Sequence, residues 1–142
     1  MSAEPQHPAL RDAWWAFLEA RFTDRATLAA GLAELDAPAL VSLAAHVIVA
    51  RNLVRARDQG PEIEGQRLNP LATEELTEWI VGKGRASWRS CLGAPDALLA
   101  RLYARFLEAS SPQLLGEIFH AYTARGAGDL NDAVDAYLAA DA

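Results

Sequence analysis

Apolar residues recur every three or four positions along almost the whole chain, and the alternation typical of a half-buried β-strand is nearly absent. A spacing of three to four places such residues on one face of an α-helix, whereas a strand requires a spacing of two. The stretch from Leu98 to Phe106 is an example, with Leu99, Leu102 and Tyr103 in between. The pattern therefore predicts an all-α fold.

Residues that start and stop helices divide the chain into seven or eight predicted helices. Pro8 suits a first helical turn, because its missing N–H would have no partner there. Asp24, Asp36 and Thr73 are expected N-caps, because their side-chain oxygens can accept the free N–H groups of a first turn. Further boundaries are expected at Gly60-Pro61, Gly82, Gly84, Gly93, Pro95, residues 110–112, Gly126, Gly128 and Asp129.

The length of 142 residues corresponds to one domain with a substantial core. We expect residues 1–7 to form a flexible tail and residues 8–142 to form a single compact helical domain. Residues 60–72 are predicted to be an irregular loop, since they combine proline, glycine and asparagine with charges. The expected core includes Trp14, Phe17, Leu43, Val47, Trp79, Leu98, Leu102 and Phe106.

The net charge indicates which class of partner is expected, and the N-terminus indicates the compartment. The net charge of −6 argues against a nucleic-acid partner, because a phosphate-binding surface needs clustered Lys and Arg. The N-terminus lacks the features of a signal peptide, so the cytoplasm is the expected compartment. The most apolar stretch, residues 39–54, is interrupted by His46, Arg51 and Asn52, and no membrane association is expected.

No cluster of residues predicts a catalytic, metal or cofactor site. Cys91 is the single cysteine, which excludes an intramolecular disulfide and a cysteine zinc cluster, and an apolar helical context favours a buried thiol. His46 lacks acidic neighbours at helical spacing and is expected to lie in the core. Glu117 and His120 share a helix face, but a di-metal bundle needs a second such pair, so a surface ion pair is expected.

Two tryptophans and an arginine on either side of a helix break are candidate binding residues. Trp79 and Trp88 could clamp a ligand, or they could be wedges between helices, which we favour. Arg85 follows Gly84 at a helix start, where a cation is poorly placed against the helix dipole. We therefore expect Arg85 to have a specific acceptor, either a carboxylate such as Glu74, Glu75 or Glu78, or backbone carbonyls.

A second candidate is a group of arginines near the expected end of the third helix. Arg51 and Arg55 lie one turn apart, Arg57 follows before the expected helix end at Gly60, and Arg67 lies in the loop. The favoured interpretation is a solvated face that complements the helix dipole. The alternative is a docking patch for an acidic partner, with the neighbouring loop as its second wall.

One stretch supports a family resemblance: Leu76-x-x-Trp79-Ile-Val-x-Lys-Gly84-Arg85-x-x-Trp88-x-x-Cys-Leu-x-x-Pro95-Asp-x-Leu98. It resembles a bacterial domain-of-unknown-function family with an aromatic, Trp-Leu-Ile, Gln-Gly-Arg, Tyr and Pro-Asp signature, some members of which are joined to WGR-type modules. The resemblance covers about residues 14–99. It departs in the middle loop, where the family has an aromatic-rich segment before a Cys and paired Asp. It implies an all-helical bacterial protein and supplies no mechanism.

These observations leave two functional hypotheses. The first is a non-catalytic interaction or regulatory domain, such as an antitoxin-like or immunity-like protein that binds another protein. The second is an enzyme or small-molecule binder with a pocket near Trp79, Arg85 and Trp88. The candidate partner-binding residues are Arg51, Arg55, Arg67, Trp79, Arg85 and Trp88. The oligomeric state, including a homodimer, stays open.

Overall fold

Eight α-helices and one short β-hairpin make up the computed structural model, which describes residues 4–140. This confirms the all-α prediction. The helices are α1 (Asp12–Arg21), α2 (Arg25–Ala33), α3 (Ala37–Val54), α4 (Pro70–Gly82), α5 (Arg85–Cys91), α6 (Asp96–Glu108), α7 (Leu114–Ala124) and α8 (Leu130–Ala140). Strands β1 (Glu62–Ile63) and β2 (Gln66–Arg67) pair antiparallel.

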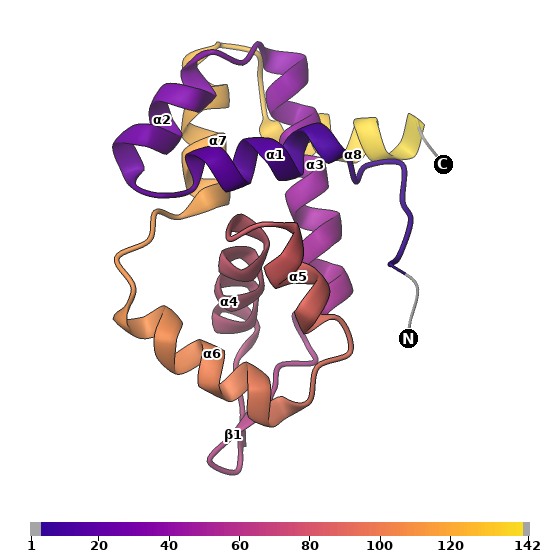
Figure 1. The fold of residues 1–142 in the computed structure, drawn as a ribbon. Helices are drawn as coiled ribbons and strands as arrows, with labels where there is room; N and C mark the ends of the chain where they lie inside the picture. Colours follow the sequence, from indigo (N-terminus) through magenta and orange to yellow (C-terminus); the bar gives the residue numbers. More distant parts are fainter. Residues whose placement is uncertain (1–3, 141–142) are drawn as a thin grey trace.

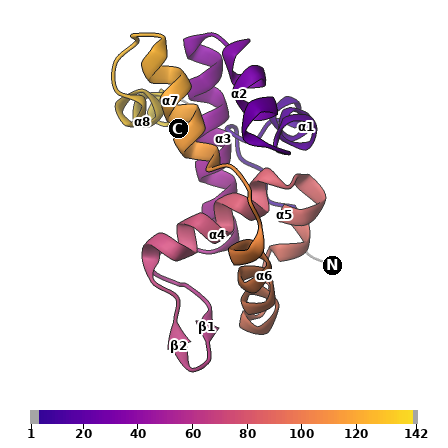
Figure 2. The same cartoon turned by 90° about the vertical axis from the view of Figure 1, so that its left-hand side faces the viewer.

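The fold is organised around α3. Helices α1, α2, α7 and α8 gather around one end of α3, whereas α4, α5 and α6 lie at the other end, beside the hairpin (Figures 1 and 2). Helix α3 contacts α4, α5, α7 and α8 directly. Ten of its eighteen residues are consequently buried, and Leu40, Leu43 and Val47 have no exposed surface.

By length and composition, α3 alone among the described helices could cross a membrane. His46, Arg51 and Asn52 do not make it too polar for that, contrary to the sequence-based argument. The packing of α3 accounts for its apolar composition, because its neighbours in the fold cover much of its surface. A helix at the centre of a domain is expected to be apolar on most sides.

Local capping signals identify some helix starts correctly and others incorrectly. Asp24 accepts the Thr27 N–H at 2.8 Å and Asp36 accepts the Ala39 N–H at 2.9 Å, as predicted. Pro8 does not start a helix, since α1 begins at Asp12. Thr73 is not a cap either. Asn69 is the N-cap of α4, and Pro70 occupies the first turn.

The segment between α3 and α4 begins and ends earlier than predicted, and it is more ordered. Helix α3 ends at Val54 rather than near Gly60, and the hairpin and the start of α4 occupy much of the expected loop. Position 60 requires glycine because the backbone of Leu68 passes close to it, and a Cβ at this position would clash with the Leu68 carbonyl oxygen. Residues 110–112 precede α7 without capping it. Gln113 is the N-cap residue, but its own side chain does not cap α7, and the first-turn N–H of Leu115 is accepted by Glu78 of α4 instead.

On two helices the buried residues lie about one position after the residues predicted to be buried. Leu43, Val47 and Trp79 are buried as predicted. On α1 and α6, however, the buried side chains are Trp15, Leu18 and Leu99. Trp88 of α5 packs against Trp15 and donates to the Ala50 carbonyl of α3. The predicted core residues that are only partly buried, although they pack against the core, are Trp14, Phe17, Leu98, Leu102 and Phe106.

Candidate functional site

A groove of about 530 Å³ lies between α4, α6 and the start of α7. Its rim carries Leu71 and Leu107, which are 65% and 64% exposed. A single exposed apolar side chain is ordinary on a folded surface. Large apolar side chains that flank one hollow are informative, because such groups mark binding sites. The lining residues are Phe22, Leu71, Glu75, Glu78, Trp79, Phe106, Leu107, Ala109, Ser111, Pro112, Gln113, Leu114 and Gly116.

Trp79 forms the aromatic wall of this groove and is held from three sides. Its indole N–H donates to Ser111 Oγ at 3.0 Å, which ties α4 to the connection between α6 and α7. The ring of Phe106 lies 5.6 Å away, and Lys83 Nζ lies 4.4 Å from the Trp79 ring centroid. Trp79 is only 6% exposed, so it offers a fixed edge rather than a mobile side chain.

Two carboxylates give the groove its polarity. Glu78 is largely buried and accepts the Leu115 N–H at 2.5 Å, and burial raises its pKa. Arg51 lies 3.8 Å from its second oxygen. Glu75 is half-buried and makes no ion pair within residues 4–140. Since no Lys or Arg lines the groove, its charged groups are all negative.

The arginine group that was a candidate docking patch is neutralised within the chain. Arg51 contacts Glu74 at 3.4 Å, and Arg57 contacts the same carboxylate at 3.1 Å. Arg55 donates to Asp96 at 2.6 Å and to two backbone carbonyls. Arg67 donates to the Gly60 carbonyl at 2.8 Å. These contacts join α3, α4, α6 and the hairpin. Arg51 and Arg55 are therefore not part of the solvated face that we favoured, whereas Arg57 and Arg67 remain more than half exposed.

Trp79 and Trp88 do not enclose a common cavity. Trp88 has no exposed surface, its N–H donates to the Ala50 carbonyl at 2.8 Å, and its ring lies 4.9 Å from Trp15. Trp79 instead lines the groove on α4. The two tryptophans are wedges between helices, which was the favoured interpretation of the pair.

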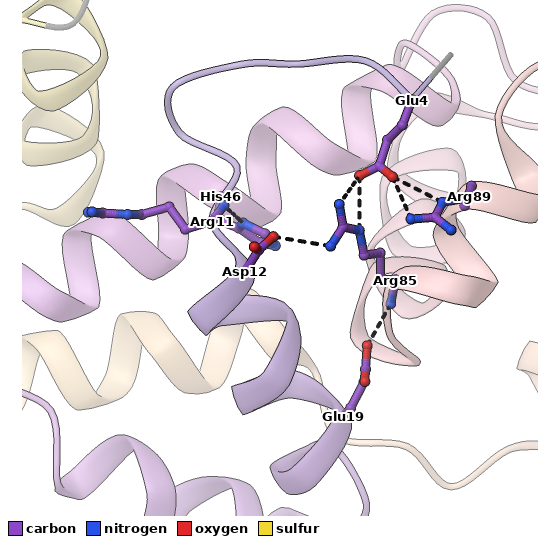
Figure 3. Close-up of polar contacts among 7 residues, drawn as sticks. All are labelled: Glu4, Arg11, Asp12, Glu19, His46, Arg85 and Arg89. Atoms are coloured by element: carbon purple, nitrogen blue, oxygen red, sulfur yellow. Dashed lines mark hydrogen bonds and ion pairs between the residues drawn. The ribbon is translucent and has the colours of Figure 1, made fainter. Parts of the chain in front are cut away.

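Arg85 is paired, as predicted, but its partners come from the N-terminal segment and α1 rather than from α4 (Figure 3). Its guanidinium contacts Glu4 at 2.9 Å and Asp12 at 3.1 Å, and its backbone N–H donates to Glu19 at 3.0 Å. Partial burial alone would raise the pKa of Glu4, but hydrogen bonds from Arg85 and Arg89 lower it. Residues 1–3 of the expected tail lie outside the described residues.

The histidines and the cysteine show no catalytic arrangement. His46 is fully buried, accepts the Arg11 N–H at Nδ1, and packs against Trp15 at 4.4 Å. His120 is exposed and does not pair with Glu117, which instead contacts Arg25 at 2.7 Å. Cys91 is buried as predicted, and burial raises its pKa. Within residues 4–140 no three His, Cys, Asp or Glu side chains are grouped to hold a metal ion.

Comparisons of the chain with protein-family models, curated proteins and solved structures find no match. The resemblance to the domain-of-unknown-function family therefore stays a prediction.

Sequence reasoning identified Trp79 and missed the rest of the groove. Leu71 and Leu107 have the helical spacing of core residues, and nothing local marks them as exposed. Glu75 looked like a candidate partner for Arg85, whereas it lies on the groove wall. The usable signal was the run of apolar residues around most of α6, which exceeds what one packing face needs.

Proposed function

We propose that this protein is a non-catalytic interaction domain that binds a partner protein through the groove between α4, α6 and α7. The observation that carries the proposal is the pair of exposed leucines, Leu71 and Leu107, on the rim of a groove with the fixed edge of Trp79. Such a combination suits an amphipathic helix, which places apolar side chains one turn apart into a hydrophobic groove.

The charges of the groove specify the chemistry of that partner segment. Glu75 has no ion pair in the described chain, and Glu78 is only weakly compensated by Arg51 at 3.8 Å. A cation that lay against Glu75 would gain attraction without displacing a resident cation, whereas Glu78 already has Arg51 and the Leu115 N–H beside it. The partner segment is therefore an apolar helix that also carries Lys or Arg. This role fits an antitoxin-like or immunity-like protein, and it uses only Trp79 of the residues singled out from the sequence.

A displayed library of amphipathic helical peptides tests this proposal, because selection from a library requires no identified partner. Selection on the full-length protein should enrich peptides that combine an apolar stripe with Lys or Arg. Leu107→Glu should weaken their binding by about tenfold or more, because a buried apolar anchor is lost and a charge enters the groove. Glu75→Gln should reduce the preference for cationic peptides over their Gln counterparts.

Leu53→Glu is the matched control, since Leu53 is 39% exposed and does not line the groove. It should leave peptide binding unchanged. Circular dichroism of each variant checks that the fold is kept, as expected for surface positions. Selected peptides that bind Leu107→Glu as tightly as the native protein would contradict the proposed groove.

A further inference from the structure

Two arginines on α5 enclose one carboxylate on the side of the molecule that bears α1 and the N-terminal segment. Arg85 donates to Glu4 Oε1 through Nε at 3.0 Å and lies within 2.9 Å of it through Nη2. Arg89, one turn later, donates to Oε2 through Nε at 3.0 Å and Nη2 at 2.6 Å. Each oxygen thus has two guanidinium nitrogens (Figure 3). Two arginines with this fork geometry recognise a planar carboxylate specifically.

The carboxylate that they enclose belongs to a segment with little packing of its own. Gln6, His7 and Pro8 are exposed, and a mainly polar hollow of about 310 Å³ lies beside the segment, lined also by Asp12 and Arg85. The segment is attached again at its far end, where Ala9 is buried and the Arg11 N–H donates to His46 at 3.1 Å. Glu4 can therefore leave the arginines while the end nearer α1 keeps its contacts.

The other arginines with several close contacts have partners on helices or their immediate connections. Arg51 pairs with α4, and Arg55 pairs with the start of α6. Arg125 donates to three carbonyls at the end of α2, with distances of 2.7 to 3.2 Å. Those partners cannot move without disturbing helix packing. The Arg85–Arg89 pair differs because its shared partner is a residue that precedes the first helix.

We propose that Arg85 and Arg89 form a carboxylate-binding site, which Glu4 fills within the chain and which an acidic segment of a partner protein fills in its place. A tethered ligand of this kind competes at a millimolar effective concentration. An external carboxylate must therefore be present above that effective concentration, or belong to a segment that makes further contacts with the protein. The site lies on α5 and does not depend on the groove, so the two proposals stand separately.

The experiment vacates the site in the full-length chain with Glu4→Gln. The probe is an end-blocked peptide that copies residues 2–7, Ser-Ala-Glu-Pro-Gln-His, and NMR titration follows its binding. The Glu4→Gln variant should bind this peptide about tenfold or more tightly than the native protein, since the internal competitor is absent. The same peptide with Gln in place of Glu should lose that gain.

Two further variants separate a carboxylate site from a general charge effect. Arg89→Gln in the Glu4→Gln background should return binding to the native level or below, and Arg89 is exposed enough for the fold to tolerate the change. Glu34→Gln removes the same charge from a surface ion pair with Arg21 and should leave peptide binding as in the native protein. Equal binding by the native and Glu4→Gln proteins, or binding that survives Arg89→Gln, would overturn the proposal.

Discussion

Replacement of Trp88 by alanine is expected to lower the free energy of unfolding by about 3–5 kcal/mol, the usual cost of truncating a buried large aromatic residue. Trp88 has no exposed surface and lies against Trp15, so the change would leave a cavity between α5, α1 and α3. It would also leave the Ala50 carbonyl without the indole N–H that it accepts at 2.8 Å. Urea unfolding followed by circular dichroism measures the loss.

Phe119→Ala is the control for this measurement, because Phe119 is also aromatic and lies in a helix but is 45% exposed. Its free energy of unfolding should change by no more than about 0.5 kcal/mol, as for most surface positions. A loss below about 1 kcal/mol for Trp88→Ala, far less than a buried aromatic residue normally costs, would mean that α5 is not wedged against α3 as described.

Acidification from about pH 6.5 to pH 4 is expected to destabilise the protein through His46. Burial lowers the pKa of His46 from its ordinary 6.5 to about 4. The unfolded chain therefore binds a proton in this interval that the folded chain does not, and stability falls as the pH falls. Below pH 4 both states carry the proton, so the His46 contribution levels off. The full loss is at most about 3 kcal/mol.

Unfolding curves at several pH values for native protein and His46→Gln test this expectation. The variant should be less stable near neutral pH and should lose less stability between about pH 6.5 and 5, because glutamine does not titrate. The pKa values of Asp24 and Asp96 are lowered chiefly by hydrogen bonds with Thr27 and Arg55. These two carboxyls therefore affect stability only at pH values near and below the ordinary carboxyl pKa. Glu78, whose raised pKa acts with the opposite sign as the pH falls, is present in both proteins, so a pH dependence that is the same in native protein and His46→Gln over that interval would contradict the assignment.

The helix content and several helix starts follow from short-range chemistry, which is why the sequence predicts them. An Asp that caps a helix needs only its own first turn, as Asp24 and Asp36 show. The start of α1 depends on distant residues instead. The N–H of Arg11, just before α1, donates to His46, and Trp15 lies against Trp88. Neither contact is visible in the local pattern that favoured Pro8 as the first helical residue.

The candidate groove was less predictable because three elements far apart in the sequence build it. Leu71 and Leu107 acquire their exposure only from the way α4, α6 and α7 meet. Arg85 shows the same limit more sharply. Its dipole position at the start of α5 predicted that it needs an acceptor, and that was confirmed. The identity of the acceptor, Glu4, depends on the path of the N-terminal segment, which carries no periodic signal.

The central position of α3 has a consequence for synthesis on the ribosome. Helices α7 and α8 cover α3, yet they are translated well after it. At elongation rates of about 5–20 residues per second, the interval from Val54 to Leu130 lasts several seconds. During that time the longest helix of the described chain, which is apolar along most of its length, is incompletely covered, and the nascent protein is most prone to aggregate. Slow codons between α6 and α7 would prolong that exposure.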